Sequence, residues 1–170
     1  IGLKVASQFI EDEIPADRLE KIIEETIDFD IPLKKVSNQI AALELFHGPT
    51  WAFKDVGARF LSRCMAYFIE QSNREITILV ATSGDTGGAV AAGFFGIPGI
   101  QVKILYPKGK VSEIQRKQLT TWGGNITAFE VAGTFDDCQR LVKQSFLDND
   151  LNKAISLSSA NSINIARLIP

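Results

Sequence analysis

Short apolar runs alternate with helical stretches through the second half of the chain. Each run is rich in β-branched residues and is expected to form a buried strand, while the stretches between them show helical spacing or begin with a capping residue. The expected strands are 75–81, 101–106, 125–131 and 154–157, and the expected helices are 87–95, 112–121 and 134–147. This order predicts βαβ units around a parallel sheet, and therefore an α/β fold.

The first half has a different pattern. An apolar stripe at helical spacing predicts a helix over 15–29, and a second stripe predicts a long helix over about 52–71. A short strand is expected at 33–37, and an apolar stretch at 39–46 leads into a Gly-Pro turn. Residues 1–13 are weakly patterned and no element is assigned to them.

Lys54 lies on the first turn of the expected helix 52–71. The unpaired amides at a helix start carry a partial positive charge, and burial beside Trp51 and Phe53 would further favour the neutral amine. A neutral lysine amine attacks carbonyl groups and forms a Schiff base. A first-turn lysine can equally be an ordinary solvated residue, so the rest of the chain must decide between the two interpretations.

A glycine-rich loop, residues 82–88 (TSGDTGG), follows an expected strand and opens an expected helix. Its three glycines allow close approach of a ligand, and the helix-start amides together with the hydroxyls of Thr82, Ser83 and Thr86 could hold a carboxylate or a phosphate. The loop is neither a Walker A motif nor a GxGxxG motif. The alternative is a glycine turn that serves the backbone alone.

A second polar segment follows the last expected strand. Asn161 and Ser162 could form another anion site, with Arg167 supplying a bidentate charge, although an ordinary capped helix start would look similar. Lys108 and Lys110, in a third loop, are expected to be solvated. Ligands of parallel sheets bind at the carboxyl ends of the strands, so these loops should gather at one edge.

Bulk properties exclude several classes of protein. The 170 residues can bury a substantial core, and a net charge of −2 gives no basic surface for nucleic acid. No apolar run approaches the roughly 18 residues of a membrane span. Cys64 and Cys138 are expected to be buried thiols of a cytoplasmic protein. A single histidine and two separated cysteines make a His/Cys metal site unexpected.

Taken together, the motifs resemble those of the threonine synthase family, of the long bacterial and fungal type. They are HGPTWAFKDVGARFL, ATSGDTGGAVA, ILYPKGKVSEIQ, GGNI, FDDCQRLVKQ and SSANSINIARL, and they cover about residues 40–170. The lysine and SGDTG motifs are shared more loosely by all type II (tryptophan-synthase-β-like) pyridoxal phosphate enzymes. The NSxNxxR pattern favours threonine synthases over cysteine synthase and threonine dehydratase, whose substrates lack phosphate. Another type II enzyme and a non-catalytic phosphometabolite-binding domain remain the alternatives.

The resemblance implies a partial chain of the type II fold, with a three-layer parallel sheet. Residues 1–74 would belong to the large domain and carry the Schiff-base lysine, and 75–170 would form a smaller domain with the substrate-anion loops. The implied cofactor is pyridoxal 5'-phosphate, held by Lys54 with Phe53 beside its ring. The implied activity is that of a carbon–oxygen lyase acting on phosphates, which converts O-phospho-L-homoserine and water to L-threonine and phosphate. Lys54 would then move protons at the α and β carbons.

The resemblance also assigns the remaining site residues. Asp85 stands near the cofactor's 3'-oxygen, where many relatives have asparagine. The substrate's α-carboxylate would be bound by Ser83, Gly84, Asp85 and Thr86, and its phosphate by Asn161, Ser162 and Arg167.

The two ends of the chain are unusual, since it starts at Ile1 without methionine and stops at Pro170 inside an apolar segment. We expect a piece of a longer protein. In the family, the loop for the cofactor's phosphate and the group facing its pyridine nitrogen lie further toward the C-terminus. The isolated piece is therefore expected to bind cofactor poorly and to be inactive.

Overall fold

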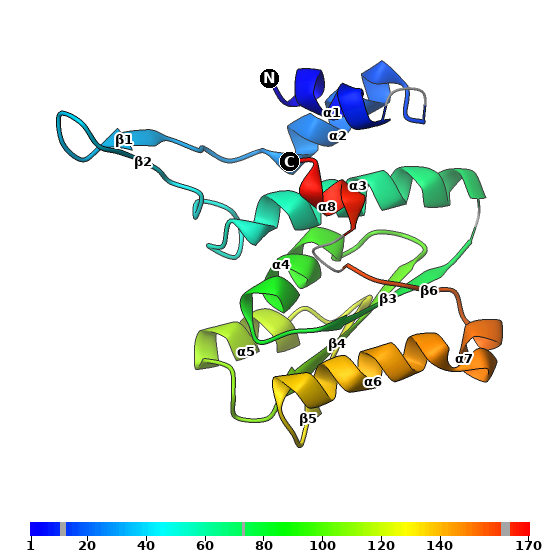
Figure 1. Cartoon of the computed structure of the whole chain (residues 1–170). Coiled ribbons are helices and arrows are strands. Elements are labelled where there is room, and N and C mark those ends of the chain that lie inside the picture. Colours follow the sequence, from blue (N-terminus) through cyan, green and yellow to red (C-terminus); the bar gives the residue numbers. More distant parts are fainter. Residues whose placement is uncertain (11–12, 73, 161–163) are drawn as a thin grey trace.

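A four-stranded parallel sheet forms the centre of the chain in the computed structural model, which describes residues 1–10, 13–72, 74–160 and 164–170 (Figure 1). The strand order is β5-β4-β3-β6, and all three neighbouring pairs are parallel. The strands are β3 (Ile76–Ala81), β4 (Ile100–Pro107), β5 (Ile126–Val131) and β6 (Leu157–Ser158). The predicted parallel α/β sheet is confirmed.

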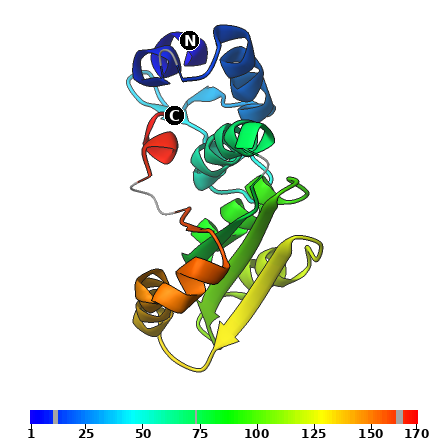
Figure 2. The same ribbon diagram turned by 90° about the vertical axis from the view of Figure 1, so that its right-hand side faces the viewer.

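Helices cover both faces of this sheet and make three layers. Helices α4 (Asp85–Phe94) and α5 (Glu113–Thr120) lie on one face, and α6 (Phe135–Leu147) lies on the other (Figures 1 and 2). One prediction at the end of the sheet was wrong. Residue 154 ends a short helix, α7 (Asn149–Ala154), and does not begin a strand, because the side chain of Asp148 caps a new helical turn there.

In the described part of the first half, the chain forms three helices and a hairpin. The helices are α1 (Gly2–Ile10), α2 (Ala16–Thr26) and α3 (Lys54–Ser72), and the antiparallel hairpin consists of β1 (Leu33–Lys35) and β2 (Ala41–Leu43). The hairpin projects from the body and carries exposed apolar side chains. Helix α1 was not predicted; it forms because Ala6 and Ile10 pack into a cluster with α2 and α3.

Helix α3 lies between two apolar clusters, which explains why it carries apolar residues on two faces and not on one. Ala58, Leu61 and Ile69 pack with the sheet and α4, whereas Phe60 and Cys64 pack with α1 and α2. Burial on both sides fixes the direction of α3, and therefore the position of its first residue, Lys54.

The order in which the chain adds strands to the sheet reverses between β3 and β6. The chain runs from β3 to β4 to β5 on one side and then returns to place β6 on the other side of β3. Open α/β sheets bind ligands at such a reversal, outside the carboxyl ends of the strands. The loops after β3 and β6, which include residues 82–84 and 159–160, leave the sheet at this point.

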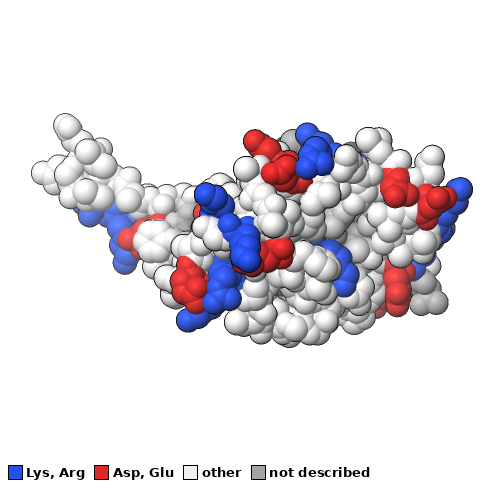
Figure 3. Space-filling view, turned by 90° about the horizontal axis from the view of Figure 1, so that it is seen from below, with Lys and Arg blue, Asp and Glu red and all other residues white. Residues whose placement is uncertain are grey.

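The outer surface carries charges of both signs. On the face seen from below, Lys and Arg side chains are interspersed with Asp and Glu, and the projecting arm at the left is largely white (Figure 3). Among the described residues, no helix is both long enough and apolar enough to span a membrane.

Candidate functional site

Lys54 and Asp85 come together at the starts of two helices. Lys54 is the first residue of α3 and Asp85 the first of α4, and Lys54 Nζ lies 3.9 Å from Asp85 Oδ2. The Nζ atom also lies 4.6 Å from the centroid of the Phe53 ring. The Lys54 side chain is 29% exposed, so its amine is within reach of a ligand.

The expected burial of Lys54 beside Trp51 and Phe53 is only partial, since its side chain is 29% exposed and its amine lies over the Phe53 ring. The two aromatic residues are 71% and 62% exposed. The inward positions of this turn are taken instead by polar groups, Thr50 and Asp55, which are 7% and 1% exposed. The Phe53 ring therefore contacts the Lys54 amine and is otherwise exposed to solvent.

Asp55 holds the turn that leads to Lys54, a role that the sequence analysis missed. Its carboxylate accepts hydrogen bonds from the amide of Thr50, at 2.9 Å, and from the Thr50 hydroxyl. Gly48 packs against the same carboxylate, since a methyl group at this position would lie 2.5 Å from Asp55 Oδ2. An acidic residue in the first turn of a helix was the available signal.

The glycine-rich loop after β3 is built around the hydroxyl of Thr82. This buried hydroxyl accepts hydrogen bonds from the amides of Gly84, at 2.9 Å, and Gly87, at 2.8 Å. The expectation that Thr82 faces an anion was therefore wrong, because its oxygen is used to shape the loop.

The ligand-facing part of this loop is smaller than predicted. Ser83 and Asp85 are exposed and Thr86 is partly exposed, while Gly84 is buried with φ 142°, a value that glycine alone adopts readily. The amides of Asp85 and Thr86 lie in the first helical turn, where N–H groups have no intrahelical acceptor. These amides and the Ser83 hydroxyl are the groups of the loop that are left for a ligand, and their predicted role in binding a carboxylate stays a prediction.

Two glutamines of α5 contact the site and were also missed. Gln115 Nε2 donates to Asp85 Oδ1 at 2.8 Å, and Gln118 Nε2 donates to the Thr50 carbonyl at 3.3 Å. Ser112 and Gln115 form a capping box, and the sequence Ser-x-x-Gln was its signal. Lys108 and Lys110, just before this helix, are exposed as predicted.

Arg167 lies in α8 (Ile165–Leu168), against the start of α3. Its Nη1 donates to the Ala160 carbonyl at 2.8 Å, and its buried Nε has no hydrogen-bond partner among the described residues. Burial lowers the pKa of Arg167 below its usual value. A methyl group at Gly57 would lie 3.1 Å from the Arg167 carbonyl oxygen and 3.6 Å from Nε.

Arg167 therefore contacts the helix that begins at Lys54. Gly57 lies three residues after Lys54 on α3, and residues at this spacing share one face of a helix. The predicted anion residues Asn161 and Ser162 lie outside the described residues. An anion that bound here would accept a hydrogen bond from this buried guanidinium nitrogen.

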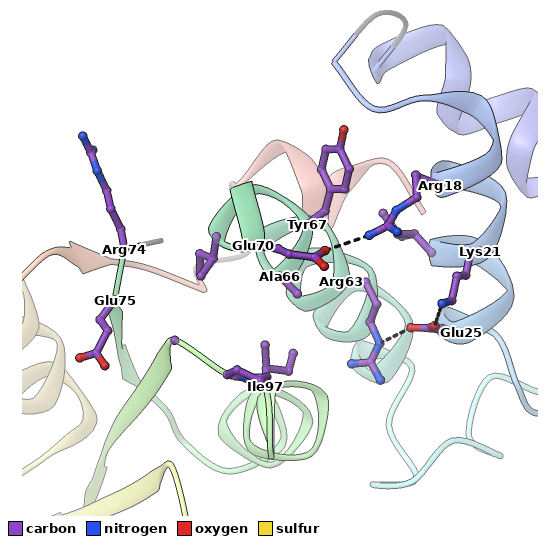
Figure 4. A pocket seen from close by; sticks show the side chains of 14 residues that line it. Arg18, Lys21, Glu25, Arg63, Ala66, Tyr67, Glu70, Arg74, Glu75 and Ile97 are labelled. Carbon is purple, nitrogen blue, oxygen red and sulfur yellow. Dashed lines mark hydrogen bonds and ion pairs between the residues drawn. The ribbon is translucent and has the colours of Figure 1, made fainter. Parts of the chain in front are cut away.

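A large cavity lies away from these residues. It has a volume of about 620 Å³ and lies between α2, α3 and the segment before β4 (Figure 4). Several of its charged side chains are already paired with one another, as in the Arg18–Glu70 contact at 2.9 Å and the Arg63–Glu25 contact at 3.8 Å. None of the predicted site residues lines it, so we place the site by its chemistry and not by cavity size.

The residues at the sheet edge fit pyridoxal phosphate. That molecule has an aldehyde and an aromatic ring, and the chain offers a reachable amine with an exposed aromatic face beside it. Among the described residues, no group of three or more His, Cys, Asp or Glu side chains is arranged to hold a metal ion.

Comparison with known families defines the class of protein. The family described as "Pyridoxal-phosphate dependent enzyme" matches residues 31–167 of this chain. The chain therefore belongs to the family of pyridoxal-phosphate dependent enzymes, and pyridoxal phosphate is the cofactor that its site fits.

Within that family, the similar proteins are threonine synthases. The chain is 49% identical to threonine synthase of Escherichia coli K12 over 166 residues, which is 98% of this chain and 38% of the relative. It is 41% identical to threonine synthase of Schizosaccharomyces pombe, covering 99% of this chain and 36% of that protein. The chain thus spans less than two fifths of the length of these relatives.

Solved structures agree. The crystal structure of E. coli threonine synthase superposes with a TM-score of 0.90, at 49% identity, covering 99% of this chain and 39% of that one. The structure of threonine synthase from Brucella melitensis with bound pyridoxal phosphate gives 0.91 at 44% identity, covering 98% and 37%. The E. coli diaminopropionate ammonia lyase, at 16% identity and 0.61, shares the fold alone.

Proposed function

We propose that this chain is the lysine-bearing part of a threonine synthase, a carbon–oxygen lyase that converts O-phospho-L-homoserine and water to L-threonine and phosphate. The observation that carries the proposal is the contact of Lys54 Nζ with Asp85 Oδ2, at 3.9 Å. Asp85 follows β3, the strand at which the strand order of the sheet reverses. The 49% identity to a threonine synthase over nearly the whole chain supports this choice within the family.

Lys54 has two tasks in this proposal. Its amine holds the cofactor, and it later carries protons to and from the substrate's α and β carbons. When bound, pyridoxal phosphate supplies the electron sink that makes those protons acidic. The Asp85 carboxylate keeps the side chain directed toward the head of α4, and Phe53 offers its ring face beside the cofactor.

The substrate's two anionic groups have separate sites. Its α-carboxylate is bound by the Ser83 hydroxyl and the first-turn amides of Asp85 and Thr86, with Gly84 allowing close approach. Its phosphate is bound by Arg167, whose buried Nε needs an acceptor, together with Asn161 and Ser162. A substrate with a carboxylate at one end and a phosphate at the other matches this pair of sites.

The proposed setting is the cytoplasm, with a small molecule as the partner and neither nucleic acid nor membrane. Cys64 and Cys138 are both free thiols, which supports a reducing compartment. The mixed charges of Figure 3 agree with the absence of a basic footprint.

The test is substrate selection by the full-length enzyme. We expect it to release phosphate and form threonine from O-phospho-L-homoserine, and to process O-acetylserine and threonine at least about a hundredfold less well, because a buried arginine without its phosphate costs several kcal/mol. A preference for either phosphate-free substrate would assign a different type II enzyme. Binding of O-phospho-L-homoserine without turnover, in the presence of cofactor, would assign a non-catalytic binding protein.

A further inference from the structure

The side-chain amide of Gln115 links the starts of α5 and α4. Its Oε1 accepts from the Ser112 amide at 2.9 Å, and its Nε2 donates to Asp85 Oδ1 at 2.8 Å. The orientation is fixed by chemistry, since turning the amide over would set a donor against a donor and an acceptor against a carboxylate. Gln115 therefore presents a hydrogen-bond donor to Asp85.

The carboxylate of Asp85 is thereby divided between two partners. Oδ1 is held by Gln115, and Oδ2 faces Lys54 at 3.9 Å. Because the two oxygens are rigidly linked, the bond to the first sets the direction of the second. Through Gln115 and Asp85, the position of α5 therefore affects the position of the Lys54 amine.

Gln115 is also packed against the glycine loop. A methyl group at Gly84 would lie 2.3 Å from Gln115 Cδ, so the two surfaces are in direct contact. One turn later, Gln118 donates to the Thr50 carbonyl in the turn before Lys54. Helix α5 thus contacts both segments that carry the proposed site.

We propose that Gln115 is a positioning residue for the proposed reaction, which holds the Asp85 carboxylate in the direction of Lys54. A capping role alone does not require glutamine. Glutamate serves equally in a capping box, because only the Oε1 acceptor is used there. Among the described residues, the hydrogen-bond partner of the Nε2 donor is Asp85.

The test compares Gln115→Glu with Ser112→Ala in the full-length enzyme. Gln115→Glu keeps the cap but sets a carboxylate against Asp85, so we expect kcat/KM to fall about tenfold or more, as for a lost charge-assisted hydrogen bond, with a fall in Tm no larger than that of Ser112→Ala. Ser112→Ala removes the capping hydroxyl but keeps the Ser112 amide, which donates to Gln115 Oε1. It should lower Tm and leave kcat/KM within about twofold.

A second readout does not depend on turnover. In the cofactor-free enzyme, the rate at which acetic anhydride modifies Lys54, relative to exposed Lys108, should fall several-fold in Gln115→Glu, because the added negative charge holds the ammonium form. Ser112→Ala should not change this ratio. If threonine synthase activity were absent but the labelling ratio changed, the contact of residue 115 with Lys54 through Asp85 would stand and the proposed function alone would fail.

A double variant covers the case in which Gln115→Glu folds poorly. Combined with Asp85→Asn, it restores a hydrogen bond in the reversed direction, so the two changes should be non-additive. The kcat/KM of the double variant should then exceed the value predicted by multiplying the effects of the two single variants. Additive losses, unchanged kinetics and labelling in Gln115→Glu, or an equal loss in Ser112→Ala would each overturn the proposal.

Discussion

Arg167 is the residue whose surroundings depart furthest from those of an ordinary surface arginine. Its Nε is buried without a partner among the described residues, and burial lowers its pKa, while Gly57 leaves room for it beside α3. A fixed guanidinium binds phosphate through two parallel hydrogen bonds, which a lysine cannot reproduce.

Replacing this residue tests its role in substrate binding. We expect Arg167→Ala in the full-length enzyme to raise KM for O-phospho-L-homoserine by about tenfold to a hundredfold, as for a lost charge-assisted contact. Arg167→Lys should recover only part of the loss. The control is Arg74→Ala, an exposed arginine away from the site. Steady-state kinetics with unchanged KM in Arg167→Ala would contradict the assignment.

Thr50 and Asp55 give a prediction about stability. Thr50→Val conserves shape but leaves the buried Asp55 Oδ1 without its hydroxyl donor, which should lower the free energy of unfolding by about 1–3 kcal/mol. Chemical denaturation measures this change. Thr120→Val, at an exposed helical position, is the matched control and should shift stability by about 0.5 kcal/mol or less. Equal effects of the two substitutions would show that the buried hydroxyl is not needed.

At the scale of elements, helix α6 begins with a capping box whose acid titrates unusually low. The Thr134 amide, then Arg140, and then the Thr134 hydroxyl hold the pKa of Asp137 at about 2, below the ordinary 3.8. A lowered pKa in the folded state contributes stability that is present above pH 3.8 and is lost as the pH falls through about 2.

The start of α6 should therefore loosen in acid. Comparing the wild type with Asp137→Asn at each pH, we expect the wild type to show greater protection from amide hydrogen exchange in the first turns of α6 at about pH 5, and the difference to vanish near pH 2. A difference that grows toward low pH would reverse the sign and contradict this account of the cap.

The elements that the sequence predicted well are those with local signals. The strand runs of β3, β4 and β5 and the caps at Ser112 and Thr134 were found within two residues or fewer. Helix α1 was missed because its apolar positions find partners only through packing on α2 and α3. Propensity within the segment carries no information about such distant contacts.

The site divides in the same way. Lys54 and the glycine loop were predicted from their residue types and spacing, and the structure places Lys54 close to Asp85 of that loop. Thr82 was given the wrong role, since a hydroxyl looks the same whether it faces a ligand or the backbone. Gln115 and Gln118 were missed because their partners, Asp85 and Thr50, are brought close by the fold alone.

At the scale of the whole molecule, the chain covers only part of its relatives, and its site is open. Trp51 and Phe53, on either side of the turn into α3, are largely exposed, and so is the projecting hairpin. The division into parts at 1–74 and 75–170 stays a prediction, and α3 contributes to the clusters on both sides.

The isolated chain should therefore be inactive. We expect the 170-residue chain to bind pyridoxal phosphate at least about tenfold more weakly than the full-length enzyme and to form no threonine from O-phospho-L-homoserine, since the family's cofactor-phosphate loop is not among its motifs. Threonine formation by the isolated chain, at a rate near that of the full-length enzyme, would refute this expectation.

The central claim is that one particular amine, that of Lys54, holds the cofactor. Borohydride reduction of the full-length enzyme loaded with pyridoxal phosphate fixes the cofactor to whichever lysine binds it, and peptide mass spectrometry identifies that residue. We expect the label on Lys54 in the wild type and its loss in Lys54→Ala. Label on another lysine, or an unchanged yield of label in Lys54→Ala, would contradict it.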